Sequence, residues 1–192
     1  PRAPYVDNRF KYNWHWFWDT GNGDIGNQGV HEIDIARWAI KDSTLPASVW
    51  SLGGRFIPGE KEYHDQGQTP NMQLAVFDYG ETLLLFEVRG LVGNNGPPSM
   101  VTNEFYTSEG VIKDGKFTAR DGGKQYDVEV PDVKVTPGGA FGSFIAAVRS
   151  RKPEDNNADA ETAHYSAALC HLANASFRLG EPQPFGKEAK SL

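Results

Sequence analysis

The stretch Gly26–Asp34, with the sequence GNQGVHEID, is the most informative part of this chain. Its glycines are followed by apolar residues at roughly helical spacing, which predicts a helix over residues 28–41. His31 and Asp34 lie three residues apart, about one helical turn, and so face the same side of that helix. An imidazole and a carboxylate at a helix start indicate a chemical site.

The sequence changes character after this helix. Short β-prone runs are separated by Gly, Pro, Asn and Asp, and they lie at 47–56, 72–79, 82–90, 101–107, 110–118 and 125–130. The segments Asp78–Glu81 and Lys113–Lys116 indicate hairpin turns, which predicts antiparallel pairing. Helices are predicted at 140–151 and 159–179, and the apolar face of the first comprises Phe141, Phe144, Ile145 and Val148. The pattern predicts an α+β fold in which one predominantly antiparallel, open sheet has helices packed on one face.

Length and composition narrow the possible functions. A chain of 192 residues fits a single domain over residues 1–192, and roughly 70% of its unfolded surface can be buried. The net charge of -6, with evenly scattered charges, argues against a nucleic-acid partner. No apolar run reaches the roughly 18 residues of a membrane span, so we expect a soluble protein without a membrane partner. The lone Cys170 leaves the compartment open, either cytoplasmic or exported from a bacterium.

An aromatic segment precedes the helix start. An extended backbone would place Trp14, Trp16 and Trp18 on one side, where they either stack on a sugar ring or belong to the core. The following segment, Asp19–Asp24, is rich in turn-forming and hydrogen-bonding residues. This composition is typical of one wall of a small-molecule site, and we expect Trp18 and Asp19 to lie near the ligand.

Other polar residues have both functional and structural interpretations. His31 either exchanges a proton or satisfies neighbouring polar groups. Asp34 either orders His31, binds a hydroxyl, or pairs with a nearby Arg or Trp. For His164, in the last predicted helix, a core or surface position is the structural interpretation. The polar loop 63–66 is a candidate lid. His31 and Asp34 lack a third ligand at suitable spacing, so no metal is expected.

Three parts of the sequence together resemble the Gfo/Idh/MocA oxidoreductases. Trp16–Asp19 and Gly23–Trp38 resemble the start of that family's C-terminal substrate domain. Phe144–Pro153 resembles its penultimate helix and the loop after it, and Ala163–Asn174 resembles its last helix. The resemblance runs over about Asn13–Gly180, nearly the whole chain.

The resemblance implies a nicotinamide-dependent oxidation or reduction of a sugar, inositol or related polyol. The family pairs an N-terminal nucleotide-binding domain with this C-terminal domain, whose open sheet commonly mediates oligomerisation, so a homo-oligomer is expected. NAD or NADP would be bound mainly by the N-terminal domain, which also carries the catalytic lysine. That domain is absent here, and Pro1 in place of Met indicates a processing or cloning boundary, so we expect the isolated chain to be inactive. Gly21–Gly26 fits a spaced-glycine formula but follows no apolar strand, so we reject it as a dinucleotide-binding turn.

Within this chain, the resemblance places His31 at the histidine that exchanges a proton with the substrate hydroxyl. Four residues earlier the family usually has an aspartate, whereas this chain has Asn27. An amide can orient an imidazole but cannot stabilise an imidazolium by charge. Asn27 is therefore expected either to orient His31 or to cap the helix, and Asp24 or Asp19 can take the carboxylate's part. Asp19, Asp24 and Asp34 are expected polar contacts to the substrate. The resemblance also implies that the last helix passes behind the pocket, which makes His164 a candidate substrate contact.

Two alternatives to an oxidoreductase stay open on sequence alone. The first is redox-assisted glycoside cleavage, also represented in the family, in which transient oxidation of the sugar acidifies a neighbouring C–H and enables elimination. The second is a noncatalytic carbohydrate-binding or assembly module, which Asn27 and the absent nucleotide-binding domain favour. Accumulating NADH would indicate the oxidoreductase, and glycoside cleavage without net cofactor consumption would indicate the glycosidase.

Overall fold

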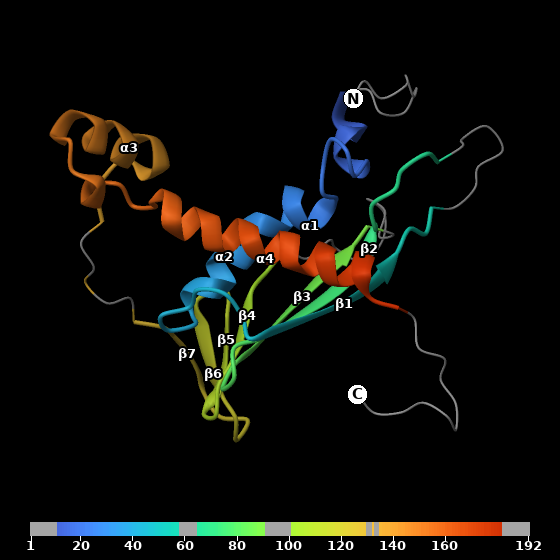
Figure 1. The fold of residues 1–192 in the computed structure, drawn as a ribbon. Coiled ribbons are helices and arrows are strands. Elements are labelled where there is room, and N and C mark those ends of the chain that lie inside the picture. The colour runs from blue at the N-terminus through green and yellow to red at the C-terminus, as the bar shows by residue number, and fades with distance from the viewer. Residues whose placement is uncertain (1–10, 58–64, 91–100, 130–131, 133–134, 182–192) are drawn as a thin grey trace. The chain divides into compact units, whose positions relative to one another are not determined.

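The structure is a computed structural model that describes residues 11–57, 65–90, 101–129, 132 and 135–181 (Figure 1). The chain divides into two compact units. The first unit comprises Pro1–Asn27, Pro46–Leu91 and Cys170–Leu192, and the second comprises Gln28–Leu45 and Val92–Leu169.

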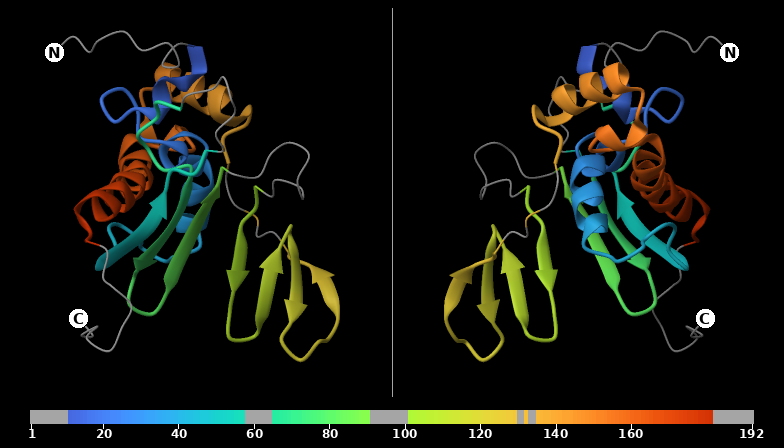
Figure 2. Two further views of the ribbon diagram at one scale, coloured as in Figure 1. Left: turned by 90° about the vertical axis from the view of Figure 1, so that its right-hand side faces the viewer. Right: turned by 90° about the vertical axis from the view of Figure 1, so that its left-hand side faces the viewer.

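The first unit is built on a three-stranded antiparallel sheet with the strand order β1-β2-β3 (Figure 2). The strands are β1 (Ser48–Gly54), β2 (Met72–Asp78) and β3 (Leu83–Arg89). Every second residue of β2 is buried, and Ala75 and Phe77 are fully enclosed, because alternate side chains of a strand point to one face. The unit also contains η2 (Lys11–Trp16), α1 (Asp24–Asn27) and the C-terminal half of α4 (Ala160–Leu179).

The other face of this sheet is apolar and exposed. Trp50 and Leu85 both lie opposite Val76 in the strand register, which places them on the same face. Trp50, Leu52, Leu83 and Leu85 are 56%, 67%, 56% and 64% exposed, and we call these four residues the outer sheet face. A contiguous exposed apolar patch is typical of an interaction surface.

The second unit begins with α2 (Gly29–Trp38) and continues with a four-stranded antiparallel sheet in the order β4-β5-β6-β7. Its strands are β4 (Glu104–Tyr106), β5 (Gly110–Lys113), β6 (Lys116–Ala119) and β7 (Gln125–Asp127). A row of apolar side chains crosses this sheet and ends in a Phe117–Tyr126 ring pair with centroids 5.2 Å apart.

The helices of the second unit are α2, α3 (Gly139–Ser150), the short η3 (Pro153–Asp155) and the N-terminal half of α4. The predicted apolar face of α3 is present but exposed, with Phe141 at 87% and Phe144 at 57%. No helix within the described ranges is long and apolar enough to cross a membrane.

The predicted α+β class with antiparallel open sheets is confirmed, and so are both hairpin turns. Asp114 and Gly115 have φ values of 50° and 73°, the left-handed pair that a two-residue turn between β5 and β6 requires. The predicted turn divides the β-prone run 110–118 into β5 and β6. Among the described residues the antiparallel strands form two sheets, one of three strands in the first unit and one of four strands in the second.

Two helical predictions also need correction. The helix predicted over 28–41 ends at Trp38, where the Ala39 N–H caps the carbonyls of the last turn. The tryptophan alternation predicted for an extended backbone does not apply, because η2 makes residues up to Trp16 a 3-10 helix with three residues per turn.

Candidate functional site

His31 lies in the first turn of α2, and its imidazole is exposed. Within the described residues, this side chain forms no hydrogen bond or ion pair. Side-chain hydrogen bonds to Glu32 hold the first turn of this helix. The side-chain amide of Gln28 donates to Glu32 Oε1 at 3.3 Å, and that of Asn103 donates to Glu32 Oε2 at 3.0 Å. The Glu32 carboxylate also complements the helix dipole. The site therefore has a fixed helix start and an open imidazole.

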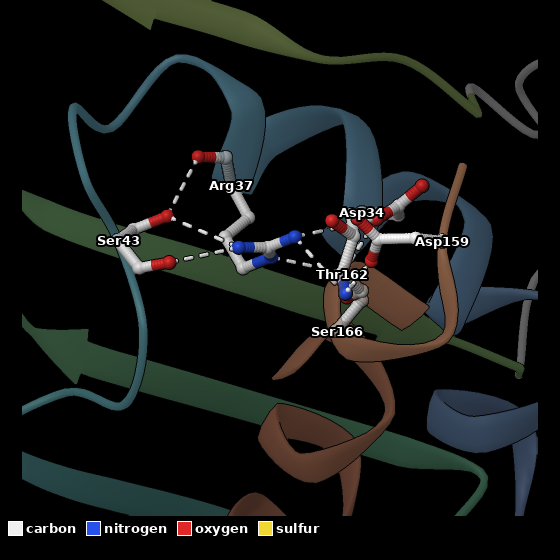
Figure 3. A network of polar contacts seen from close by, with 6 residues as sticks. All are labelled: Asp34, Arg37, Ser43, Asp159, Thr162 and Ser166. Carbon is white, nitrogen blue, oxygen red and sulfur yellow. Dashed lines mark hydrogen bonds and ion pairs between the residues drawn. The ribbon is translucent and has the colours of Figure 1, made fainter. Parts of the chain in front are cut away.

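A buried guanidinium lies near the other end of α2 (Figure 3). Arg37 is 7% exposed, and its Nε donates to Ser166 Oγ at 2.9 Å. Its Nη1 donates to the Ser43 carbonyl at 2.8 Å, and its Nη2 donates to the Thr162 carbonyl at 3.2 Å. The Ser166 hydroxyl in turn donates to Asp34 Oδ1, which lies 4.0 Å from Arg37 Nη2. Every segment around the guanidinium thus supplies an oxygen acceptor.

Asp34 is consequently part of a structural network, and its side chain is 29% exposed. Its Oδ1 is occupied by Ser166 and Arg37. Asp159 stands at the start of α4, where its carboxylate accepts the Thr162 N–H at 2.7 Å. This backbone hydrogen bond holds the pKa of Asp159 below its ordinary range.

A surface depression of about 570 Å³ lies beside this network, and it is lined by Arg37, Trp38, Ile40, Asp42, Ser43, Thr44, Asp159, Glu161, Thr162 and Tyr165. None of the predicted site residues lines it, so we do not place the site there.

Asp24, at the start of α1, lies among charged and aromatic groups of the first unit. Its Oδ1 is 3.7 Å from Nε2 of the buried His15. Burial raises the pKa of Asp24, and the charges of His15 and Arg55 counteract this only in part. The Arg55 guanidinium binds Asp65 through Nε at 2.5 Å and Nη2 at 2.6 Å, and it lies 4.8 Å over the Trp16 ring. Asp24 is therefore a desolvated carboxylate beside a fixed cation.

The other predicted residues lie at several places in the fold. The Trp18 ring receives the Arg178 guanidinium 4.8 Å from its centroid. Asn27 is the last residue of α1, and Asp19 and His164 are exposed. The predicted residues divide between the units, with Trp18, Asp19, Asp24 and Asn27 in the first and His31, Asp34 and His164 in the second.

Four polar residues of these two clusters were not among the predicted site residues, namely Arg37, His15, Arg55 and Thr69. Arg37 had a signal, since it follows Asp34 by one helical turn. His15 had only its position between two tryptophans, and its burial follows from packing that no local pattern encodes. Of the predicted lid at 63–66, residues 63 and 64 lie outside the described residues.

Neither a metal centre nor a thiol nucleophile stands out. In the part of the chain that the structure describes, no group of three or more His, Cys, Asp or Glu side chains is arranged to hold a metal ion. Burial raises the pKa of the Cys170 thiol to about 12, so the reactive thiolate is scarce at neutral pH.

The family can now be assigned. A family model described as the GFO/IDH/MocA C-terminal domain matches residues 2–112, more than half of the chain. The chain belongs to the GFO/IDH/MocA family. The matched residues include α2 with His31 and the three strands of the first unit. No curated protein sequence matches the chain.

Solved structures share the fold of this family member. A protein from Thermotoga maritima that carries an oxidoreductase name matches with a TM-score of 0.64 and 18% identity, over 89% of this chain and 50% of its own. The WlbA dehydrogenase from Bordetella pertussis, in complex with NADH and UDP-GlcNAcA, matches with a TM-score of 0.55 and 14% identity, over 90% of this chain and 50% of its own. YvaA from Bacillus subtilis, which also carries an oxidoreductase name, matches with a TM-score of 0.55 and 16% identity, over 92% of this chain and 53% of its own. The chain spans about half the length of these proteins.

Replacing Arg37 tests the buried network. We expect Arg37→Met to lower the free energy of unfolding by about 3 kcal/mol, because the acceptors around the guanidinium lose their charged donor. Arg89→Met is the matched control, since Arg89 pairs with Glu87 at an exposed site, and it should change the free energy of unfolding far less than Arg37→Met. Urea unfolding measures both changes, and equal losses would contradict the account.

Asp24 should give a pH-dependent stability difference of defined sign. A carboxyl whose pKa is raised on folding stabilises the protein below its ordinary value of 3.8 and loses that contribution as the pH rises through the folded pKa. Asp24→Asn should therefore raise the free energy of unfolding at pH 7, with a gain that shrinks as the pH is lowered. Asp159→Asn, at a carboxylate with a lowered pKa, should change stability in the opposite direction. Unfolding curves at pH 7 and pH 5 test this, and a loss for Asp24→Asn at pH 7 would be the wrong sign.

Proposed function

We propose that this chain is the substrate-binding part of an NAD(P)-dependent oxidoreductase that acts on a sugar or cyclic polyol, with His31 as the proton-transfer residue. The observation that carries the proposal is the exposed imidazole of His31, which is bound to no other described residue and stands on a fixed helix start. Family membership supports the reaction class. The likeness to WlbA, a dehydrogenase in complex with NADH and UDP-GlcNAcA, supports a nicotinamide cofactor and a sugar ligand.

The part of the reaction assigned to this chain is the movement of the hydroxyl proton. When an alcohol carbon loses a hydride, its oxygen loses a proton, and an unprotonated imidazole nitrogen can accept that proton. Asp34 has one carboxylate oxygen outside the Ser166 hydrogen bond and stays a candidate for a substrate hydroxyl. The role of Asn27 in orienting His31 stays a prediction from the sequence, as do the substrate contacts of Trp18, Asp19 and His164.

The described residues do not form a phosphate cradle for the cofactor. The chemistry that a nicotinamide supplies is hydride transfer. Gly21–Gly26 follows the 3-10 helix η2 rather than a strand, and α1 is only four residues long. We therefore assign NAD(P) binding mainly to the N-terminal nucleotide-binding domain that the family resemblance implies.

The variant His31→Asn tests the role of the imidazole in the full-length protein. We expect kcat for sugar oxidation with NAD or NADP to fall by roughly 10²–10⁴-fold, because the proton acceptor is lost, while substrate binding changes little. His171→Asn, at another exposed histidine, should retain full activity. Retention of kcat in His31→Asn would contradict the proposal.

The same assay separates the oxidoreductase from the glycosidase. An oxidoreductase accumulates reduced cofactor in proportion to the oxidised sugar. A redox-assisted glycosidase cleaves a nitrophenyl glycoside with no net change in cofactor, and that result would replace the first assignment.

We also propose that two copies of the chain associate through the outer sheet face. Four large apolar side chains are more than half exposed there, and burying them against a second copy removes this apolar area from water.

A charge placed in the outer sheet face should break this association. We expect Trp50→Lys to halve the mass measured by light scattering after gel filtration, because the two-fold related lysines would be buried close together. Phe141→Lys, on the exposed face of α3, is the control and should leave the mass unchanged. An unchanged mass for Trp50→Lys would remove the sheet from the interface.

A further inference from the structure

The Thr69 hydroxyl is a buried polar group without a hydrogen-bond partner among the described residues. The residue is 0% exposed, and the unpartnered atom is Oγ1. Leaving a buried hydroxyl unsatisfied is costly, so such an atom in a native structure points to a water, an ion or another polar group beside it. The position of this hydroxyl therefore indicates what binds nearby.

The backbone around Thr69 is firmly placed. Its N–H donates to the Trp16 carbonyl at 3.0 Å, and its own carbonyl accepts from Arg55 Nη1 at 3.1 Å. Its side chain lies against Gly23, where an added Cβ would come within 3.1 Å of Oγ1. Gly23 has a φ of +77° and directly precedes Asp24, so the unsatisfied hydroxyl lies beside the start of α1.

Asp24 adds a second oxygen acceptor. Its carboxylate is 27% exposed and accepts no hydrogen bond from the described part of the chain, and its Oδ1 lies 3.7 Å from Nε2 of His15. Arg55 directs its guanidinium to Asp65 and the Thr69 carbonyl instead. Thr69 Oγ1 lies beside Gly23, the residue that precedes Asp24. A ligand that carries hydroxyl groups can hydrogen-bond both to a carboxylate and to a hydroxyl.

The surrounding charges select a neutral ligand over a charged one. Arg55 lies close enough to Asp24 to act on its charge and would repel a cation. The carboxylates of Asp24 and Asp65 would repel an anion. A neutral polyol avoids both penalties and donates its hydroxyl protons to the carboxylate.

We propose that Asp24 and Thr69 form a hydroxyl-binding subsite for a neutral sugar or polyol. The proposal rests on the proposed function, because the ligand is of the same class, and it adds Thr69 as a specificity residue and gives Asp24 a defined partner. The subsite lies within the first unit and stands on the contacts of that unit alone.

Removing the Thr69 hydroxyl should separate binding from stability. Glucose, N-acetylglucosamine and myo-inositol are titrated calorimetrically into the full-length protein and its variants. We expect Thr69→Val and Asp24→Asn each to weaken binding of the recognised probe about tenfold. The Tm of Thr69→Val should be unchanged or higher, because an unsatisfied buried hydroxyl is replaced by a methyl group of similar size. Thr20→Val is the control, since Thr20 Oγ1 already donates to the Trp14 carbonyl at 2.7 Å, and it should bind normally.

The outcomes distinguish this inference from the proposed function. If the wild type binds a probe and both variants bind it equally well, the subsite is refuted while the proposed function stands. If Thr69→Val lowers the Tm with unchanged affinity, the hydroxyl has a structural role and the subsite is also refuted. If the wild type binds none of the three probes, the proposed function is contradicted together with the inference that rests on it.

Discussion

The buried charge of Arg37 is the constraint on which the second unit depends. A guanidinium that is 7% exposed has given up most of its hydration, so oxygen acceptors must replace the lost water. Ser43, Thr162 and Ser166 supply them, and they come from the segment after α2 and from the start of α4. Because α2 carries Arg37 near one end and His31 at the other, the bonds that hold the guanidinium also fix the helix that presents the imidazole.

The two polar clusters of the chain differ in a way that bears on function. Around Arg37, each polar group that we describe has a partner, which is the arrangement expected of a structural element. Around Asp24 and Thr69, a carboxylate and a buried hydroxyl lack hydrogen bonds within the described residues. The fully buried Thr69 hydroxyl and the partly exposed Asp24 carboxylate are therefore groups that a bound ligand could satisfy, whereas the groups around Arg37 already satisfy one another.

Much of the fold could be predicted because short-range chemistry specifies it. Asp114 and Gly115 predicted a turn because both adopt positive φ readily, and the spacing after Gly29 predicted α2. The fold class and the last two helices followed from the same local patterns. Of the three parts that carried the resemblance to the GFO/IDH/MocA family, residues 16–38 lie within the segment that the family model matches.

The parts that could not be predicted depend on contacts between distant residues. The Arg37–Ser166 hydrogen bond joins positions 129 residues apart, and no local pattern encodes it. The burial of Thr69 against Gly23 is of the same kind. The tryptophan alternation misled because it assumed an extended backbone where η2 forms. Local sequence patterns therefore predicted candidate residues, whereas tertiary packing determines which of these side chains are bound to other parts of the chain.

The most direct test of the account is an NMR titration of the histidine side chains in the full-length protein, with and without the sugar that the activity assay identifies. If His31 meets the substrate hydroxyl, saturation with the sugar must shift the His31 imidazole resonances and change their pH titration, while those of the exposed His171 stay in place. If the sugar binds and the His31 resonances and titration are unchanged, His31 does not transfer the proton and the central claim is wrong.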